Sequence, residues 1–265
     1  MISSLAHIDA AAIIGNNVII DPFAVIDAGV TIGEGTHIMS HATILKGTTI
    51  GKFSQVFPGA VLGAIPQDLK FIGEETTVEI GDNTTIRESV TINRGTKDQW
   101  KTVVGNNCLL MAYSHLAHDC IIGNNVILAN AVQLAGHVTV GDYAIIGGMA
   151  AAIQFATIGA HTYVAGNTEI RKDVPPFIKA GRLPLRYEGI NSVGLQRRGF
   201  STEKINEIHE IYRYIYLKNL NTTQALESIE KELPPCEEKE TIIQFIKASK
   251  RGIIKASDKA NNDED

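Results

Sequence analysis

A branched aliphatic residue recurs at every sixth position along most of the first 170 residues of this chain. The series begins at Ile8 and ends at Ile170, and Ala152 is its one unbranched member. Its two interruptions, from 62 to 80 and from 92 to 104, are multiples of six, so the register survives both. A period of six fits neither an α-helix nor a single half-buried strand. It predicts an all-β solenoid, a parallel β-helix in which each hexad forms a short strand and a corner and three hexads close one coil.

The same pattern predicts the domain boundaries. Hexads cover residues 1–172, with loops at 63–78 and 96–102, and they stop at Asp173-Val-Pro-Pro176 because proline removes a donor from the strand ladder. Residues 173–200 are expected to form a turn-rich connector. Apolar residues at helical spacing predict a small α-helical domain over 201–255, and the polar tail, 256–265, is expected to be disordered. Glycines that follow the aliphatic positions, such as Gly105, are expected at corners with positive φ.

The composition indicates the cellular compartment of the protein more clearly than its function. The formal net charge is −5 and 44% of the residues are hydrophobic, so nothing demands a nucleic-acid partner or a membrane surface. No signal-peptide pattern is present, and no apolar run reaches the ~18 residues of a membrane span. Three scattered cysteines fit reduced thiols better than a disulfide framework. We therefore expect a cytoplasmic protein.

Histidines gather near the middle of the predicted solenoid. Positions 18 apart stack in successive coils, which places His118, Gly136 and Gln154 in one column, with His115 and His137 beside it. Histidine is the side chain whose ordinary pKa, ~6.5, suits proton transfer near neutral pH. A glycine beside His118 leaves its backbone N–H open to a developing oxyanion. The convergence of three histidines favours a catalytic site over isolated corner residues.

Two other features of the sequence admit more than one interpretation. Three histidines could bind zinc, although Gly136 and Gln154, in the column of His118, are not ligands. Between 171 and 198, seven lysines and arginines stand against two acidic residues, an excess of positive charge that suits phosphates or an acidic protein partner. Long loops on a rigid scaffold, such as 63–78, are typical of functional sites.

Several motifs, in order along nearly the whole chain, resemble the UDP-N-acetylglucosamine O-acyltransferases of lipid A biosynthesis, a family of hexapeptide-repeat acyltransferases. The motifs are Gln67-Asp-Leu-Lys70, Ile86-Arg-Glu-Ser-Val-Thr-Ile-Asn-Arg-Gly95, His115-x-x-His118-Asp-Cys, Leu134-Ala-Gly-His137 and Gly194-Leu-Gln-Arg-Arg-Gly-Phe200. The hexads alone indicate only the wider superfamily. The loop motif and the double arginine narrow the resemblance to this family.

The resemblance implies a left-handed β-helix that forms a homotrimer with active sites between subunits. The implied reaction transfers a 3-hydroxyacyl chain from acyl carrier protein to the 3-hydroxyl of UDP-N-acetylglucosamine, with no metal or redox cofactor. On this basis His118 corresponds to the general base, Asp119 to its orienting carboxylate and Gly136 to the backbone donor for the oxyanion. The positions implied to bind substrate are Gln67, Asp68, Lys70, His115, His137, Gln154, Gly166, Asn191, Arg197 and Arg198.

The chain departs from the family pattern in three places. Ile153 and Pro184 stand where better-known members have histidines, and Val193 stands where they have a glutamate. The change at Pro184 leaves the acyl length open, while Gly166 has no side chain to block a hydrocarbon groove and favours a long chain. Whether the acceptor bears a 3-hydroxyl or a 3-amino group also stays open.

The alternatives are other hexapeptide-repeat enzymes. One is a coenzyme A-dependent acetyl- or succinyltransferase, a group that lacks the Gln67–Lys70 loop in this form. The other is a trimeric zinc carbonic anhydrase. The related N-acyltransferases carry an N-terminal uridine-binding domain, for which hexads starting at Ile8 leave no room.

Overall fold

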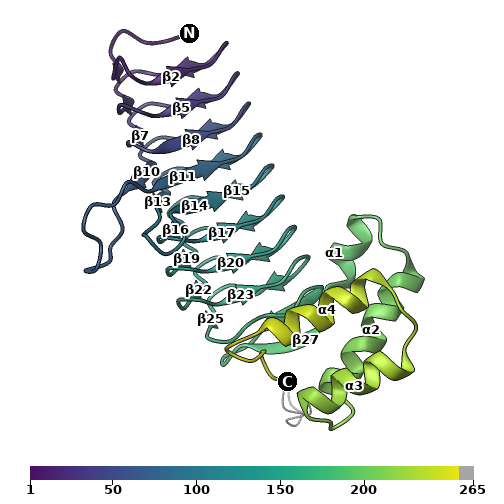
Figure 1. Cartoon of the computed structure of the whole chain (residues 1–265). Coiled ribbons are helices and arrows are strands. Elements are labelled where there is room, and N and C mark those ends of the chain that lie inside the picture. The colour runs from purple at the N-terminus through teal and green to yellow at the C-terminus, as the bar shows by residue number, and fades with distance from the viewer. Residues whose placement is uncertain (257–265) are drawn as a thin grey trace.

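The computed structural model describes residues 1–256 of the chain. Their short strands stack coil upon coil into a long prism, and helices gather at its C-terminal end (Figure 1). The prism is a left-handed parallel β-helix, which confirms the predicted fold class. Of the tail expected to be disordered, 256–265, all but the first residue lies outside the described part of the chain.

Three parallel sheets form the faces of the prism. The first contains β1 (His7–Ile8), β4 (Val25–Ile26), β7 (Thr43–Ile44), β10 (Val61–Ala64), β13 (Thr91–Asn93), β16 (His115–Leu116), β19 (Gln133–Leu134), β22 (Ala151–Ala152) and β25 (Glu169–Ile170). The second contains β2 (Ile13–Ile14), β5 (Thr31–Ile32), β8 (Thr48–Ile50), β11 (Thr77–Ile80), β14 (Lys101–Val104), β17 (Ile121–Ile122), β20 (Thr139–Val140) and β23 (Thr157–Ile158). The third contains β3 (Ile19–Ile20), β6 (His37–Ile38), β9 (Gln55–Val56), β12 (Thr85–Ile86), β15 (Leu109–Leu110), β18 (Ile127–Leu128), β21 (Ile145–Ile146), β24 (Tyr163–Val164), β26 (Ile178–Gly181) and β27 (Arg186–Ile190).

The aliphatic residues at every sixth position fill the interior of the prism. Ile86, Leu110 and Val164 are fully buried, and the unbranched member, Ala152, is buried as well. The strand register follows the sequence period, since Leu116 pairs with Leu134, 18 residues later. Each coil therefore adds a layer of aliphatic side chains to one continuous core, and this burial is the main stabilising term of such a solenoid.

The glycines after the aliphatic positions have a different role from the predicted one. Positive φ occurs two residues further on, at residues such as Asn107 (φ 56) and Asn125 (φ 57). At Gly105, an added Cβ would lie 2.5 Å from the carbonyl oxygen of Gly123 in the next coil. Glycine is therefore required at these positions by the close approach of stacked backbones, rather than by its access to positive φ.

Two segments leave the coil and return to it in register. The first, residues 65–76 between β10 and β11, projects from the side of the prism (Figure 1). The second, residues 94–100 between β13 and β14, is shorter. The first is narrower than the predicted 63–78, because β10 and β11 extend into it as four-residue strands. The second is as long as the predicted 96–102 but lies two residues earlier, because β14 already begins at Lys101.

The segment 173–200, expected to be turn-rich, contains regular structure. β26 pairs in parallel with β24, and β27 pairs antiparallel with β26, so the two strands extend the third sheet. A short helix, α1 (Ser192–Arg197), follows them. The hexad period has ended here, and the strands form because the last coil offers an open edge for pairing.

Three longer helices follow at the C-terminal end of the prism. They are α2 (Thr202–Tyr216), α3 (Thr222–Glu232) and α4 (Glu237–Ala248). Ser201 caps α2, and Asn221 forms a capping box with Gln224 at the start of α3. The wholly buried Tyr212 donates its hydroxyl to the carbonyl of Pro176 at 2.6 Å, which ties α2 to the end of the prism. No helix among residues 1–256 is both long and apolar enough to cross a membrane.

Candidate active site

The predicted stacking of His118 and Gly136 is present in the structure. Each residue follows a strand of the first sheet, β16 or β19, by two positions. A Cβ added at position 136 would lie 2.6 Å from Cε1 and 2.7 Å from Nε2 of His118. The imidazole of His118 therefore lies directly against the backbone of residue 136, and only glycine leaves room for it.

His118 and Asp119 form a buried pair at this corner. Nδ1 of His118 lies 2.8 Å from Oδ2 of Asp119, and the two residues are only 5% and 2% exposed. Since a carboxylate accepts a hydrogen bond and does not donate one, the neutral imidazole carries its proton on Nδ1. Nε2 then keeps a lone pair, so the pair is arranged as a general base with its orienting carboxylate.

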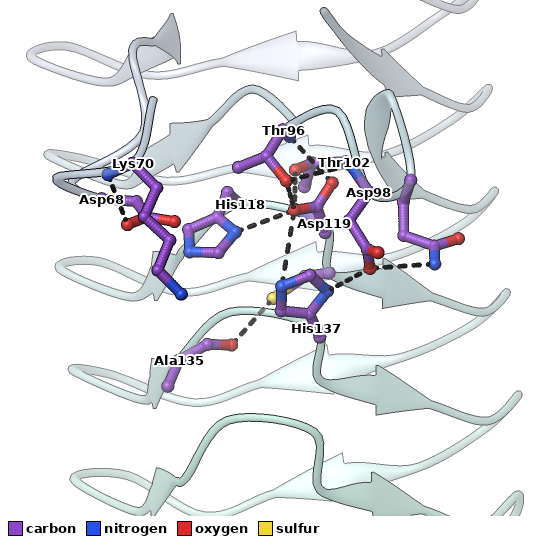
Figure 2. A network of polar contacts seen from close by, with 11 residues as sticks. Asp68, Lys70, Thr96, Asp98, Thr102, His118, Asp119, Ala135 and His137 are labelled. Atoms are coloured by element: carbon purple, nitrogen blue, oxygen red, sulfur yellow. Dashed lines mark hydrogen bonds and ion pairs between the residues drawn. The ribbon is translucent and has the colours of Figure 1, made fainter. Parts of the chain in front are cut away.

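The carboxylate of Asp119 is held by a residue of the second loop, and its backbone N–H is held by a residue of β14 (Figure 2). Thr96 donates its backbone N–H to Oδ1 at 2.9 Å and its hydroxyl to Oδ2 at 2.6 Å. The backbone N–H of Asp119 donates to Oγ1 of Thr102 at 2.9 Å. The sequence pattern indicated a functional loop at 96–102, but it did not assign a role to either threonine.

His137 lies at the next level of the same corner. Its ring meets that of His118 edge to face at 5.0 Å between centroids, and it stacks on Phe155 at 4.3 Å. Nδ1 of His137 lies 3.2 Å from a carboxylate oxygen of Asp98, while Nε2 lies 3.7 Å from Oδ2 of Asp119. Asp98 and Phe155 were not recognised in the sequence. Phe155 directly follows Gln154 of the predicted column, and this position could have identified it.

The backbone N–H of Gly136 has no hydrogen-bond acceptor in the described part of the chain. At the matching position on another corner, the N–H of Asn106 donates to the side chain of Asn124, and that of Asn124 donates to Asp142. The corresponding residue above Gly136 is Gln154, whose exposed side chain makes no such bond in residues 1–256. The N–H of Gly136 is therefore available to a ligand beside Nε2 of His118.

His115 lies on β16 and faces a shallow groove along the first sheet. Its Nδ1 is 2.7 Å from the hydroxyl of Thr91, and burial lowers its pKa below the ordinary value. The groove has a volume of about 420 Å³ and a largely apolar lining that includes Ala117, Ala135 and Ile153. Isoleucine at 153 thus contributes to an apolar surface where the family pattern has a polar residue.

The groove adjoins a smaller hollow at the end of the prism. That hollow, of about 260 Å³, shares Glu169 and Arg171 with the groove and is also lined by Leu183 and Pro184. Pro184, where the chain departs from the family pattern, therefore lines the hollow that continues the groove. The groove itself begins at Ala117, next to His118.

The long loop brings part of its motif to the site. Asp68 and Lys70 line a hollow of about 500 Å³ together with His137 and Phe155. Figure 2 draws Asp68, Lys70 and His137 around His118. The backbone N–H of Lys70 donates to Oδ1 of Asp68 at 3.0 Å, which closes the turn that presents both side chains. Gln67 is exposed and is not among the residues that line this hollow.

A basic groove lies on the other side of His137 and Phe155. It has a volume of about 700 Å³ and collects cationic side chains from the last coil and from the chain after α4. The cations that line it are Arg171, Lys172, Lys250 and Arg251. Arg171 is paired with Glu169 at 2.6 Å. Lys250 and Arg251 lie far from the basic segment 171–198 in sequence, so only the fold shows that they extend it.

The residues predicted for the nucleotide lie at a different corner of this chain. Asn191 caps α1 and donates its side-chain amide to the carbonyl of His161 at 2.9 Å, so both of its polar atoms serve the fold. Arg198 lies over the ring of Tyr143 and donates to its carbonyl at 2.9 Å, which leaves a buried Nη1 without a partner among residues 1–256. Arg197 is exposed in the last turn of α1.

Gly166 also lies apart from the His118 corner. A Cβ added there would lie 2.8 Å from the carbonyl oxygen of Gly148, so a larger residue would strain the stacking of two coils. Gly166 lines none of the hollows described above. Glycine is therefore required at this position by the stacking of coils within one chain, whether or not it also leaves a groove open.

The three histidines considered as zinc ligands, His115, His118 and His137, do not all come together in this chain. His115 is engaged with Thr91 on the face of the sheet, and the side chains that come within 4.8 Å of one another are those of His118, Asp119 and His137. In that group, Nδ1 of His118 already bonds to Asp119 at 2.8 Å, while Nε2 of His118 lies against Gly136, whose N–H has no acceptor among residues 1–256. Chemically, such an arrangement could transfer a proton at Nε2 and stabilise an oxyanion at the N–H of Gly136.

Comparison with known proteins agrees with this site. A family model described as UDP N-acetylglucosamine O-acyltransferase, domain 2, matches residues 173–254, and a bacterial transferase hexapeptide model matches 11–46 and 101–136. Acyl-[acyl-carrier-protein]–UDP-N-acetylglucosamine O-acyltransferase from Aquifex aeolicus is 58% identical over 76% of this chain and 77% of its own length. The enzyme of that name from a Sulfurihydrogenibium species is 54% identical over 96% of this chain and 94% of its own length.

Solved structures match as closely. The crystal structure of a UDP-N-acetylglucosamine acyltransferase from Bacteroides fragilis has a TM-score of 0.95 and 52% identity, covering 96% of this chain and 100% of that one. The structure of the enzyme from Francisella novicida has a TM-score of 0.94 and 40% identity, covering 97% and 95%. The chain belongs to the UDP-N-acetylglucosamine O-acyltransferase family, as its motifs predicted.

Proposed function

We propose that this chain transfers a 3-hydroxyacyl group from acyl carrier protein to the 3-hydroxyl of UDP-N-acetylglucosamine, the first step of lipid A biosynthesis. The observation that carries the proposal is the buried His118–Asp119 pair lying against Gly136. It occurs in a chain that is 54% identical, over nearly its whole length, to an enzyme with the corresponding name.

His118 is the general base of the proposed reaction. Nε2 takes the proton of the sugar hydroxyl while its oxygen attacks the thioester carbonyl, and Asp119 stabilises the imidazolium. The carbonyl electrons move onto oxygen, where the free N–H of Gly136 stabilises the oxyanion. When the carbonyl re-forms, the carbon–sulfur bond breaks, and the imidazolium returns the proton to the departing thiolate.

The surroundings of His118 suggest where each part of the substrates binds. The hollow lined by Asp68, Lys70 and His137 suits the sugar. Gln67 and Gln154 do not line it, and their proposed substrate contacts rest on the family resemblance. The apolar groove past His115 and Ile153 suits a hydrocarbon chain. The hollow that continues this groove is lined by Leu183 and Pro184. A long acyl chain is proposed because Gly166 has no side chain that could block a hydrocarbon groove.

The basic groove is the proposed approach for acyl carrier protein. Lys172, Lys250 and Arg251 line it and have no ion-pair partner among residues 1–256. Arg171, in contrast, is paired with Glu169. A phosphate-bearing arm on an acidic carrier would meet these cations on its way to His137 and then to His118.

A homotrimer is proposed because one chain does not complete the site. Arg198, with its unpartnered Nη1, lies at the Tyr143 corner, whereas His118 lies at the corner of His137. In a closed ring, the Arg198 corner of one copy can face the His118 corner of the next. We also propose that the enzyme works in the cytoplasm, where its buried free thiols, Cys108 and Cys120, would stay reduced.

A mass-spectrometric transfer assay tests the function. The protein is mixed with UDP-N-acetylglucosamine and 3-hydroxyacyl carrier proteins of graded chain length, and in parallel with the matching coenzyme A thioesters. We expect a mono-acylated nucleotide sugar from the carrier protein donors, with long chains preferred. Product from coenzyme A alone would point to the alternative transferase class. No product from any donor, with zinc retained and carbon dioxide hydrated, would point to the anhydrase.

A further inference from the structure

The loop that interrupts the hexads for the second time is well ordered around Thr96. The backbone N–H of Trp100 donates to the carbonyl of Thr96 at 2.7 Å, and that of Gly95 donates to Thr77 at 3.2 Å. The N–H of Asp98 approaches Oγ1 of Thr96 at 3.3 Å. Thr96 is 8% exposed. Its side chain is therefore fixed by the turn in which it lies and faces the inside of the site.

Thr96 contacts both oxygens of the catalytic carboxylate. Its N–H donates to Oδ1 of Asp119 and its hydroxyl to Oδ2, the oxygen that also accepts the Nδ1 proton of His118. Two donors from one residue hold the plane of the carboxylate, because rotation about its Cβ–Cγ bond would break at least one of them. Three donors in all converge on the carboxylate: the N–H and the hydroxyl of Thr96 and Nδ1 of His118.

The orientation matters because two imidazoles compete for the same oxygen. Oδ2 of Asp119 lies 2.8 Å from Nδ1 of His118 and 3.7 Å from Nε2 of His137. A modest turn of the carboxylate would bring it within bonding distance of His137 and weaken its bond to His118. The hydroxyl of Thr96 opposes that turn, while Asp98 and Phe155 hold His137 from its other sides.

We propose that Thr96 is a positioning residue for the transfer reaction. It keeps the carboxylate of Asp119 on His118, so that the imidazole holds its proton on Nδ1 and presents a bare Nε2 to the sugar hydroxyl. The effect on turnover rests on the proposed function of His118; the effect on the imidazole does not. The interruption of the hexads at this loop is then needed for the chemistry, since a regular coil would carry no residue in this place.

The kinetic test compares three substitutions. Thr96→Val keeps the shape and the backbone bond but removes the hydroxyl, and we expect kcat to fall roughly tenfold with both KM values nearly unchanged. Thr96→Ser keeps the hydroxyl and should restore most of kcat. Thr84→Val is the matched control, because Thr84 is also buried but donates its hydroxyl to the carbonyl of Gly105, away from Asp119. It should lower thermal stability without lowering kcat.

A second measurement is independent of activity. In protein labelled with ¹⁵N-histidine, the signals that vanish in His118→Ala belong to His118, and their shifts report which ring nitrogen carries the proton. We expect the Nδ1–H form in the natural protein and in Thr96→Ser, and a mixture in Thr96→Val. If the valine variant does not fold, Thr96→Ala removes the same hydroxyl without placing a methyl group against the carboxylate.

The outcomes separate this proposal from the proposed function. An unchanged imidazole in the folded hydroxyl-free variants would overturn the role of Thr96, even if kcat fell. An unchanged kcat in those variants would overturn it as well. If the natural protein transfers no acyl chain, the proposed function fails, while the ¹⁵N shifts still decide whether Thr96 orients the pair.

Discussion

The imidazole of His118 occupies the space that a side chain at position 136 would need. Its Cε1 and Nε2 lie 2.6 and 2.7 Å from where the Cβ of a residue larger than glycine would be. The general base and the oxyanion donor are thus placed by a single contact between stacked coils. At the scale of the residue, the site depends on one glycine as much as on one histidine.

Replacing the base should remove most of the activity. For His118→Ala we expect kcat to fall by about 10²–10⁴-fold while the KM for the nucleotide sugar changes little, since the proton acceptor is lost and the binding hollow is not. His41→Ala is the control, because His41 stacks on Phe23 at another corner, with ring centroids 5.2 Å apart. Steady-state kinetics of both variants check this, and near-normal turnover in His118→Ala would remove His118 from its role.

Gly136→Ala should impair catalysis more than folding. The new Cβ must push the His118 ring aside, and we expect kcat to fall by about 10²-fold or more. The displaced ring is not part of the aliphatic core of the prism, so thermal stability should drop only slightly. Gly148→Ala is a suitable comparison, because its Cβ would meet a backbone oxygen at 3.2 Å and no catalytic group. Equal losses of kcat in the two variants would contradict this explanation.

Side chains at the corners of the prism form ordered stacks of their own. At one corner the rings of Tyr143, His161 and Phe177 stack with centroids 4.9 and 5.5 Å apart, and Arg198 and Phe200, which follow α1, pack against them. Burial lowers the pKa of His161 to about 4, and the positive charge of Arg198 acts in the same direction. The stack is therefore built around a neutral imidazole.

Acid should weaken this corner before it affects the core. Since the pKa of His161 is lower in the folded chain than its ordinary 6.5, the unfolded chain binds more protons between pH 6.5 and about 4. The contribution of His161 to the free energy of unfolding is full above pH 6.5 and is lost as the pH falls toward 4. Urea denaturation at pH 7 and pH 5 should show a smaller decrease for His161→Phe than for the natural protein. An equal decrease would exclude His161 as the cause.

The whole molecule presents two functional corners that do not meet within one chain. His118, Asp119 and His137 lie at one of them, and Arg198 lies at the other with a buried, unpartnered Nη1. The proposed trimer resolves this separation, because its ring symmetry places unlike corners of neighbouring copies opposite each other. Residues of one site then come from two chains.

Mixing inactive variants tests this arrangement. His118→Ala and Arg198→Ala, unfolded together and refolded at equal amounts, should regain activity at low nucleotide-sugar concentration, because random mixing leaves about a quarter of the sites with both residues intact. A mixture of His118→Ala and Gly136→Ala should regain none, since those residues serve one site from the same chain. Native mass spectrometry would establish the number of chains and their exchange. No recovery in exchanged trimers would place Arg198 outside the neighbouring site.

Periodicity made much of the site predictable. Because the coil length is 18 residues wherever the hexads run unbroken, the contact of His118 with Gly136 follows from their spacing, and the buried aliphatic core follows from the period of six. The pairing of His118 with Asp119 was implied by the family resemblance and not by the period, and the structure places the two side chains 2.8 Å apart. Residues outside the hexads carried no such information.

The sequence by itself determined the solenoid, its register and the column that contains the base, because these depend on a repeat that every coil obeys. Only the tertiary structure decided that Thr96 holds Asp119, that Asp98 meets His137, and that Lys250 joins Lys172 in one groove. It also showed strands in the segment expected to be turn-rich. The physical reason is the same in each case: loops and chain ends follow no period, so their contacts depend on where the folded chain returns to the prism.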